Sequence, residues 1–134
     1  MLFRSDTVIL GRKTYDWVLN QGFDFPHKNR KTYVITRQSR SADGNIVFYD
    51  GNLNVLISEL KAHDGKNIFC DGGAEIVNLL LKDKLFDEMI ISIVPILLGA
   101  GTRLFAADVP EQEWSLVGSK SFSSGLVQLH YRKI

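Results

Sequence analysis

Short apolar runs rich in β-branched residues alternate along this chain with segments whose apolar residues recur at helical spacing. The first pattern predicts strands and the second predicts amphipathic helices. The expected strands are residues 6–10, 31–36, 45–49, 66–70, 86–98, 113–119 and 126–132. The expected helices are residues 13–19, residues 74–82 and a third segment. This third helix begins at residue 53, after the N-cap Asn52, and stops at residues 64–65. Alternation of this kind predicts an α/β fold with a mostly parallel central sheet flanked by helices.

The last third of the chain departs from this alternation. Residues 86–98 are apolar and β-branched in their middle, which predicts a buried central strand. The final two strands are joined across residues 123–125 and predict a C-terminal antiparallel hairpin. With 134 residues, the chain is expected to form a single domain over residues 1–134.

The composition of the chain argues against several classes of partner. The net charge is +1 and no basic run stands out, so no nucleic-acid partner is expected. The longest apolar run, residues 89–98, is interrupted by Pro95 and is far shorter than the roughly 20 residues of a membrane helix. The N-terminus lacks the apolar segment of a signal peptide. We therefore expect no membrane partner and a cytoplasmic location.

The histidines and the cysteine show no catalytic or metal-binding spacing. His27, His63 and His130 are scattered, so no metal is expected and all three are interpreted as structural. Cys70 is the single cysteine and ends an apolar strand, which is typical of a small core residue. Trp17 is likewise interpreted as a packing residue.

Three strand ends carry residues that could hold an anion. At the first, Gly11 is followed by Arg12, Lys13 and Thr14 at the start of a helix. The free N–H groups and the dipole of a helix N-terminus attract phosphate, and these side chains add two positive charges and a hydroxyl donor. The alternative is an ordinary helix start with exposed basic residues.

The second strand end is the segment Asp71–Glu75. Its paired glycines, Gly72 and Gly73, let the backbone approach a ligand closely before a helix begins. A tight strand-to-helix turn is the alternative, because the segment is not a GxGxxG fingerprint. Asp71 would either touch a substrate or cap the turn.

The third strand end is Thr36 and Arg37, whose hydroxyl and guanidinium could hold a phosphate monoester. A solvated loop is the alternative interpretation. Ligands of parallel sheets bind beyond the carboxyl ends of the strands, which meet at one edge. We therefore expect the three strand ends to form a common rim.

Five segments, in this order, resemble the dihydrofolate reductase-like fold. The resemblance is greatest to the reductase domain of the bifunctional riboflavin-biosynthesis deaminase-reductase and its stand-alone bacterial relatives. The matching segments are DTVILGRKTYDWV (6–18), YVITRQ (33–38), IFCDGGAEIVNLLL (68–81), DEMIISIVPILLGAGTRLF (87–105) and GLVQLHYRK (125–133). The resemblance implies NADPH as the cofactor, a small heterocyclic substrate and a homodimer.

The resemblance also implies roles for individual residues, and all of them concern the cofactor or the substrate. The implied cofactor-binding residues are Gly11, Arg12, Lys13 and Thr14 on the pyrophosphate side, Thr36 and Arg37 at the adenosine 2′-phosphate, and Gly72, Gly73, Ala74, Glu75 and Ile76 along the pyrophosphate and towards the nicotinamide. Ile35 is also included as cofactor-binding, without a specific contact. Asp71 is a candidate for substrate contact. No catalytic residue is assigned.

The sequence departs from the family at its beginning. Family members start with a central strand and a substrate-side segment, whereas here Met1 lies five residues ahead of Asp6. Without such a strand, a gap is expected between residues 66–70 and residues 86–98, and a gap leaves backbone groups unpaired. The chain could be clipped at its N-terminus, another chain could fill the gap, or the two strands could have closed up.

Three hypotheses about function follow. The first is an NADPH-dependent reductase that transfers hydride to a pterin- or pyrimidine-type substrate, such as 5-amino-6-(5-phosphoribosylamino)uracil or dihydrofolate. The second is a catalytically inactive nucleotide-binding or structural relative of the same fold. The third is an α/β domain that binds phosphate but is not a reductase.

Overall fold

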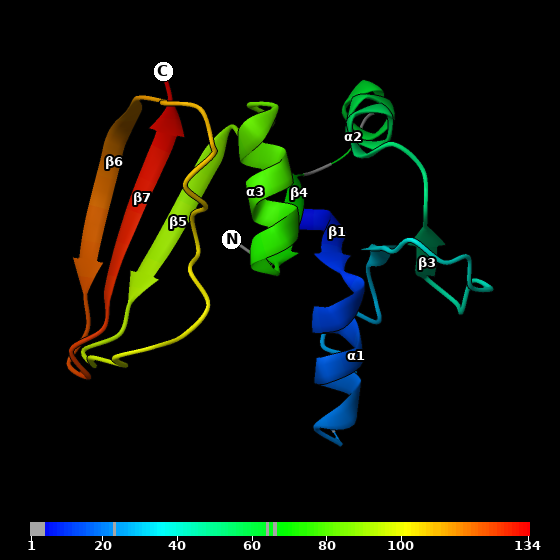
Figure 1. The fold of residues 1–134 in the computed structure, drawn as a ribbon, viewed down its shortest axis with the longest axis horizontal. Helices are drawn as coiled ribbons and strands as arrows, with labels where there is room; N and C mark the ends of the chain where they lie inside the picture. Colours follow the sequence, from blue (N-terminus) through cyan, green and yellow to red (C-terminus); the bar gives the residue numbers. More distant parts are fainter. Residues whose placement is uncertain (1–4, 23, 64, 66) are drawn as a thin grey trace.

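The computed structural model describes residues 5–22, 24–63, 65 and 67–134, which form two β-sheets with helices beside them (Figure 1). In chain order the elements are β1 (Ser5–Gly11), α1 (Arg12–Asn20), β2 (Lys31–Ile35), β3 (Ile46–Tyr49), α2 (Leu53–Ala62), β4 (Asn67–Gly72), α3 (Ala74–Lys82), β5 (Glu88–Ile93), β6 (Trp114–Ser121) and β7 (Val127–Lys133). The predicted elements are therefore present, with small shifts at most boundaries and a large one at residues 86–98. Residues 64 and 66, at the predicted end of the second helix and the predicted start of the fourth strand, lie outside the described residues.

The first sheet is parallel and has the strand order β3-β2-β1-β4 within the described residues. β1 lies between β2 and β4, and its residues Val8, Ile9 and Leu10 have no exposed surface. A strand buried on both faces reads as a continuous apolar run, because both sets of alternating side chains must face other apolar groups.

Helices cover both faces of the parallel sheet. On one face, Val8 and Leu10 pack in a cluster with Tyr15 of α1. On the other face, Ile9 packs with Ile57 of α2 and with Leu80 of α3. This arrangement confirms the expected α/β fold with a parallel sheet flanked by helices.

The second sheet is antiparallel, with the order β5-β7-β6 within the described residues. β6 and β7 form the predicted C-terminal hairpin, and β7 also pairs with β5. Figure 1 shows these three strands gathered at one end of the molecule, with α2 and β3 at the other.

The prediction of a buried central strand over residues 86–98 is wrong. β5 covers only Glu88–Ile93 and is an edge strand that pairs with β7. The regular strand ends before Pro95, which has no N–H to donate to a sheet. Beyond it, Leu97 is 98% exposed. The apolar character of residues 86–98 therefore does not reflect burial within the single chain.

β4 and β5 are not paired anywhere in the part of the chain that the structure describes. The expected gap between these strands is therefore present, and the alternative in which they close up is wrong. Among residues 5–22, 24–63, 65 and 67–134, each of the two strands has one edge whose backbone groups are not paired with another strand.

Local predictions have mixed outcomes. The side chain of Asn52 accepts a hydrogen bond from the Val55 N–H at 3.2 Å, which confirms the N-cap of α2. Trp17 is 63% exposed on α1, so its interpretation as a packing residue is wrong. None of the helices that the structure describes has the length and apolar character of a membrane span.

Candidate functional site

Two strand-to-helix turns lie at the carboxyl edge of the parallel sheet. Gly11 ends β1 and is the N-cap of α1, and Gly73 follows β4 and is the N-cap of α3. Neither helix has a side-chain hydrogen bond at its N-cap. The first N–H groups of both helices therefore lack an internal partner and can donate to an anion.

The two turns lie against each other. A Cβ atom added to Gly73 would lie 2.9 Å from Oγ1 of Thr14, and one added to Gly11 would lie 3.2 Å from Cγ1 of Ile76. The same hypothetical atom on Gly11 would be 3.8 Å from the backbone nitrogen of Gly73. Only glycine fits at both positions without movement of a neighbour.

Arginines surround the start of α1. The Arg12 Nη1 lies 3.0 Å from Oδ2 of Asp16, one helical turn further along. Arg40 donates to the same carboxylate from Nη1 at 3.2 Å and from Nη2 at 3.4 Å. The hydrogen bond from Arg40 lowers the pKa of Asp16, and the hydrogen bond from Arg12 lowers it by a smaller amount. Arg40 thus joins Arg12 at α1, a contact that the sequence did not indicate.

The end of β2 reaches the same edge through Arg37. Its side chain is 94% exposed, and its Nη2 lies 3.4 Å from Oε1 of Glu75 in the first turn of α3. Thr36 is buried, and its hydroxyl oxygen accepts a hydrogen bond from the Gln38 N–H at 3.2 Å. The ion pair is long and exposed, so a ligand can displace it at little cost.

Two apolar residues of the predicted set belong to the core. Ile76 is 6% exposed within the cluster on the α2 and α3 face, and Ile35 packs against that cluster. Their side chains stabilise the sheet.

The other two predicted residues lie at the helix starts. Lys13 is exposed on α1, and Ala74, the first residue of α3, is partly exposed.

The end of β4 carries two further polar groups. Asp71 is about one third exposed and lies 2.8 Å from Nε2 of His27. Cys70 packs against the apolar cluster on the other face, and burial raises the pKa of its thiol to about 11. Sequence reasoning did not identify this contact, because His27 is 44 residues from Asp71 and stands in a loop.

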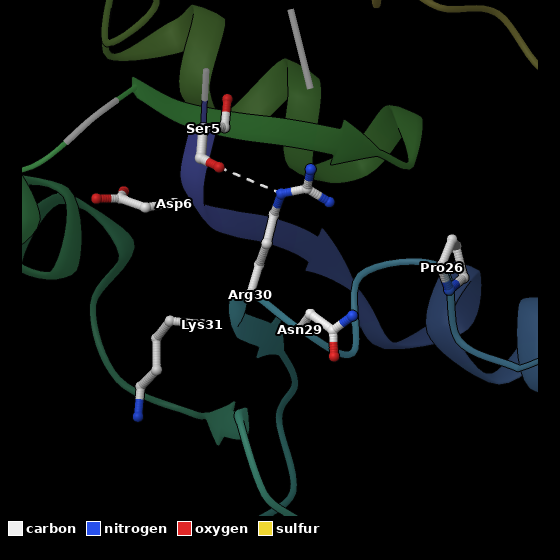
Figure 2. A pocket seen from close by; sticks show the side chains of 6 residues that line it. All are labelled: Ser5, Asp6, Pro26, Asn29, Arg30 and Lys31. Carbon is white, nitrogen blue, oxygen red and sulfur yellow. Dashed lines mark hydrogen bonds between the residues drawn. The ribbon is translucent and has the colours of Figure 1, made fainter. Parts of the chain in front are cut away.

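A hollow lies at the opposite edge of the sheet (Figure 2). It has a volume of about 410 Å³ and is lined by Ser5, Asp6, Pro26, Asn29, Arg30 and Lys31. Ser5 and Lys31 are the first residues of β1 and β2, so the hollow faces the amino ends of these strands. Figure 2 shows the hydrogen bond that Arg30 Nε donates to the backbone oxygen of Ser5. This pocket is separate from the rim that the predicted residues form.

The structure brings the three predicted strand ends to one edge. Thr14 touches the Gly73 turn, and Arg37 reaches Glu75. No group of three or more potential metal ligands occurs among the described residues. The edge is built from glycine turns, helix N-termini and basic side chains, a combination that suits a phosphorylated nucleotide.

The parallel sheet with helices on both faces and the separate antiparallel sheet agree with a dihydrofolate reductase-like α/β fold. The chain belongs to the RibD C-terminal domain family, which matches it over residues 4–128. The resemblance inferred from the five segments is thereby confirmed.

Similar proteins extend this assignment. The uncharacterized protein YwjB of Bacillus subtilis (strain 168) is 39% identical over 127 residues, 94% of this chain and 72% of that protein. The crystal structure of a putative riboflavin biosynthesis protein from Shewanella sp. PV-4 superposes with a TM-score of 0.86 at 30% identity, and the match covers 98% of this chain and 75% of that one. A 50-residue segment is 42% identical to 2,5-diamino-6-ribosylamino-4(3H)-pyrimidinone 5′-phosphate reductase of Debaryomyces hansenii, covering 37% of this chain and 20% of that enzyme.

Proposed function

We propose that this protein is an NADPH-dependent reductase that transfers hydride to a pyrimidine-type substrate, with 5-amino-6-(5-phosphoribosylamino)uracil as the first candidate. The observation that carries the proposal is the contact between the Gly11 and Gly73 turns, which places the N-termini of α1 and α3 together without side-chain caps. Membership in the RibD C-terminal domain family and the segment shared with a pyrimidinone reductase support the reductase class.

The residues at the rim fit a dinucleotide diphosphate. The uncapped N–H groups of α1 and α3 would donate to its oxygens, and the hydroxyl of Thr14 lies where the two turns meet. Arg12 and Lys13 would add positive charge on the α1 side, together with Arg40. NADPH, when bound, supplies the hydride, and the protein contributes binding and orientation.

Arg37 would select NADPH over NADH. Its guanidinium is exposed and pairs with Glu75 through a single long contact, so it is available to a 2′-phosphate. That phosphate would replace a weak surface ion pair by a bidentate, charge-assisted one. The buried hydroxyl of Thr36 already accepts from Gln38, so its part would be to shape the turn that presents Arg37.

The test is nucleotide binding measured by fluorescence titration. NADPH should bind more tightly than NADH, and Arg37→Ala should reduce that preference by about 10-fold or more, the size of one lost hydrogen bond to a charged group. Lys31→Ala is the matched control, because Lys31 is an exposed cation at the opposite end of β2. Equal affinities for NADPH and NADH in the unmodified protein would overturn the role of Arg37.

Turnover is measured separately by the loss of NADPH absorbance with 5-amino-6-(5-phosphoribosylamino)uracil, with the diaminopyrimidinone analogue and with dihydrofolate. Tight NADPH binding without turnover on any of the three would identify a catalytically inactive nucleotide-binding relative. Binding of inorganic phosphate without either dinucleotide would identify a phosphate-binding domain instead.

A further inference from the structure

His27 is a histidine held inside the protein next to the proposed site. It lies in the segment between α1 and β2 and is 4% exposed. Its ring packs against two aromatic rings, with centroids 5.5 Å from Phe25 and 6.1 Å from Phe69. Close packing against these rings restricts the orientation of the imidazole.

The same histidine makes one polar contact. Its Nε2 lies 2.8 Å from Oδ2 of Asp71, whereas Nδ1 is buried and has no hydrogen-bond partner among the described residues. An ionised carboxylate only accepts hydrogen bonds, so Nε2 carries the proton and donates it. A proton on Nδ1 would be a buried donor without an acceptor, which is costly. The packing and the hydrogen bond therefore fix both the ring and its tautomer.

Asp71 connects this buried ring to the rim. It is the last residue of β4 before Gly72, and the bond to His27 places it on the α1 face of the sheet with Phe69. Two residues later, Gly73 meets Thr14 of α1. The side chain of Asp71 is 36% exposed, so the carboxylate is bonded on the inside and open on the outside.

We propose that His27 is a positioning residue for substrate binding, acting through Asp71. The bond to Oδ2 restricts rotation of the carboxylate and leaves Oδ1, for which the described residues supply no hydrogen bond, to accept one from an N–H or O–H group of the heterocyclic substrate. A carboxylate that is already oriented loses less conformational freedom when the substrate binds. This inference rests on the proposed function, since it assumes that the substrate lies beside the Gly72–Gly73 turn.

The test compares His27→Gln with His27→Asn. The glutamine amide N–H can reach about as far as Nε2 and can still donate to Asp71, whereas the shorter asparagine amide cannot. Both variants bury a polar amide, so a general effect of polarity on the core is common to them. Affinity for 5-amino-6-(5-phosphoribosylamino)uracil is measured by calorimetry without nucleotide, and NADPH affinity is measured by fluorescence.

We expect His27→Gln to retain most of the affinity for the pyrimidine and His27→Asn to lose about 10-fold, with NADPH affinity changed less than about 2-fold in both. Asp71→Asn should lose affinity as well, and the double variant with His27→Asn should lose little more than either alone, because the two residues act as one unit. Thermal unfolding of each variant shows that it is folded at the temperature of the titration.

The outcomes separate the two levels of the proposal. If NADPH binds and the two His27 variants have the same pyrimidine affinity, the role of His27 is overturned and the proposed function stands. If NADPH does not bind, the proposed function fails, and the pyrimidine titration still decides whether His27 orients Asp71. If the unmodified protein does not bind the pyrimidine either, both proposals are overturned.

Discussion

Gly73 is the residue at which the proposed nucleotide site depends most directly on the absence of a side chain. A Cβ atom at Gly73 would lie 2.9 Å from Oγ1 of Thr14, which is closer than Cβ atoms come to other heavy atoms in folded proteins. Gly73→Ala should therefore force the two turns apart and lower the free energy of unfolding by about 1–3 kcal/mol. Urea unfolding followed by circular dichroism measures this change, and NADPH affinity should fall with it.

Gly118→Ala is the matched control for this substitution. Gly118 lies in β6, and a Cβ added there would have no atom within 4 Å. Its replacement should change the free energy of unfolding by less than about 0.5 kcal/mol. Equal effects at the two glycines would show that close contact between the turns is not what requires Gly73.

Asp16 should make the stability of the protein sensitive to acid. Hydrogen bonds from Arg40 and Arg12 lower its pKa in the folded state, relative to the ordinary value of 3.8. A lowered pKa means that the contribution to stability is complete above that ordinary value and is lost as the pH falls through the folded-state pKa. Asp16→Asn should therefore destabilise the protein at pH 7 and should differ less from the unmodified protein as the pH falls below 3.8.

Chemical unfolding at pH 7, 5 and 2.5 measures this effect. Glu59→Gln serves as the control, since it removes an exposed carboxylate from α2. A destabilisation by Asp16→Asn that stays constant across the three pH values would contradict an ionic role for Asp16. It would indicate a packing effect instead.

Single residues were predictable where a local pattern identified them. Gly11 and Gly73 stand between a strand pattern and a helix pattern, and the structure shows why each is glycine. The contacts of His27 and Arg40 were not predicted, because their partners, Asp71 and Asp16, are 44 and 24 residues away. Nothing in the residues next to them indicates such contacts, which exist only once the sheet has formed.

At the scale of elements, the long connection that follows β5 is held against α3 by the side chain of Asn78. Its Nδ2 donates to the Leu104 oxygen at 3.0 Å, and its Oδ1 accepts from the Ala106 N–H at 2.8 Å. Asn78→Ala removes both bonds, while alanine favours the helix. The Ala106 amide should consequently exchange its hydrogen about 2- to 10-fold faster, as expected for one or two ordinary hydrogen bonds.

Hydrogen exchange read out by NMR measures this effect at single amides. Asn54→Ala on α2 is the matched control, because Asn54 is exposed and lies on another helix. Unchanged exchange at Ala106 in Asn78→Ala would show that the connection is held by other contacts.

Elements were predictable when their length and periodicity agreed. α3 has the predicted bounds, Ala74–Lys82, because its apolar residues at helical spacing include three that are buried. The segment 86–98 misled because periodicity cannot distinguish a strand buried by its own chain from an apolar run left on the surface. Only the tertiary structure shows that β5 is an edge strand.

At the scale of the whole molecule, apolar surface gathers beyond β5. The exposed apolar residues of this region are Ile93, Val94, Ile96, Leu97 and Leu98, with exposed fractions from 51% to 98%. They follow one another along the chain at the end of the three-stranded sheet. A contiguous apolar segment on a surface is typical of an interface between chains.

We expect this segment to form part of a homodimer interface. Burial of one leucine side chain contributes about 1.5–3 kcal/mol, and Leu97 is almost completely exposed in the single chain. Leu97→Lys should therefore weaken dimerisation about 10-fold or more. Light scattering across a dilution series measures this, with the unmodified protein near twice the chain mass of 15.1 kDa and the variant shifted towards the chain mass. Trp17→Lys is the control, because Trp17 is an exposed apolar residue on α1, which packs against the parallel sheet. If Trp17→Lys dissociates the dimer and Leu97→Lys does not, the interface lies on the α1 face. In that case the apolar segment has been assigned to the wrong surface.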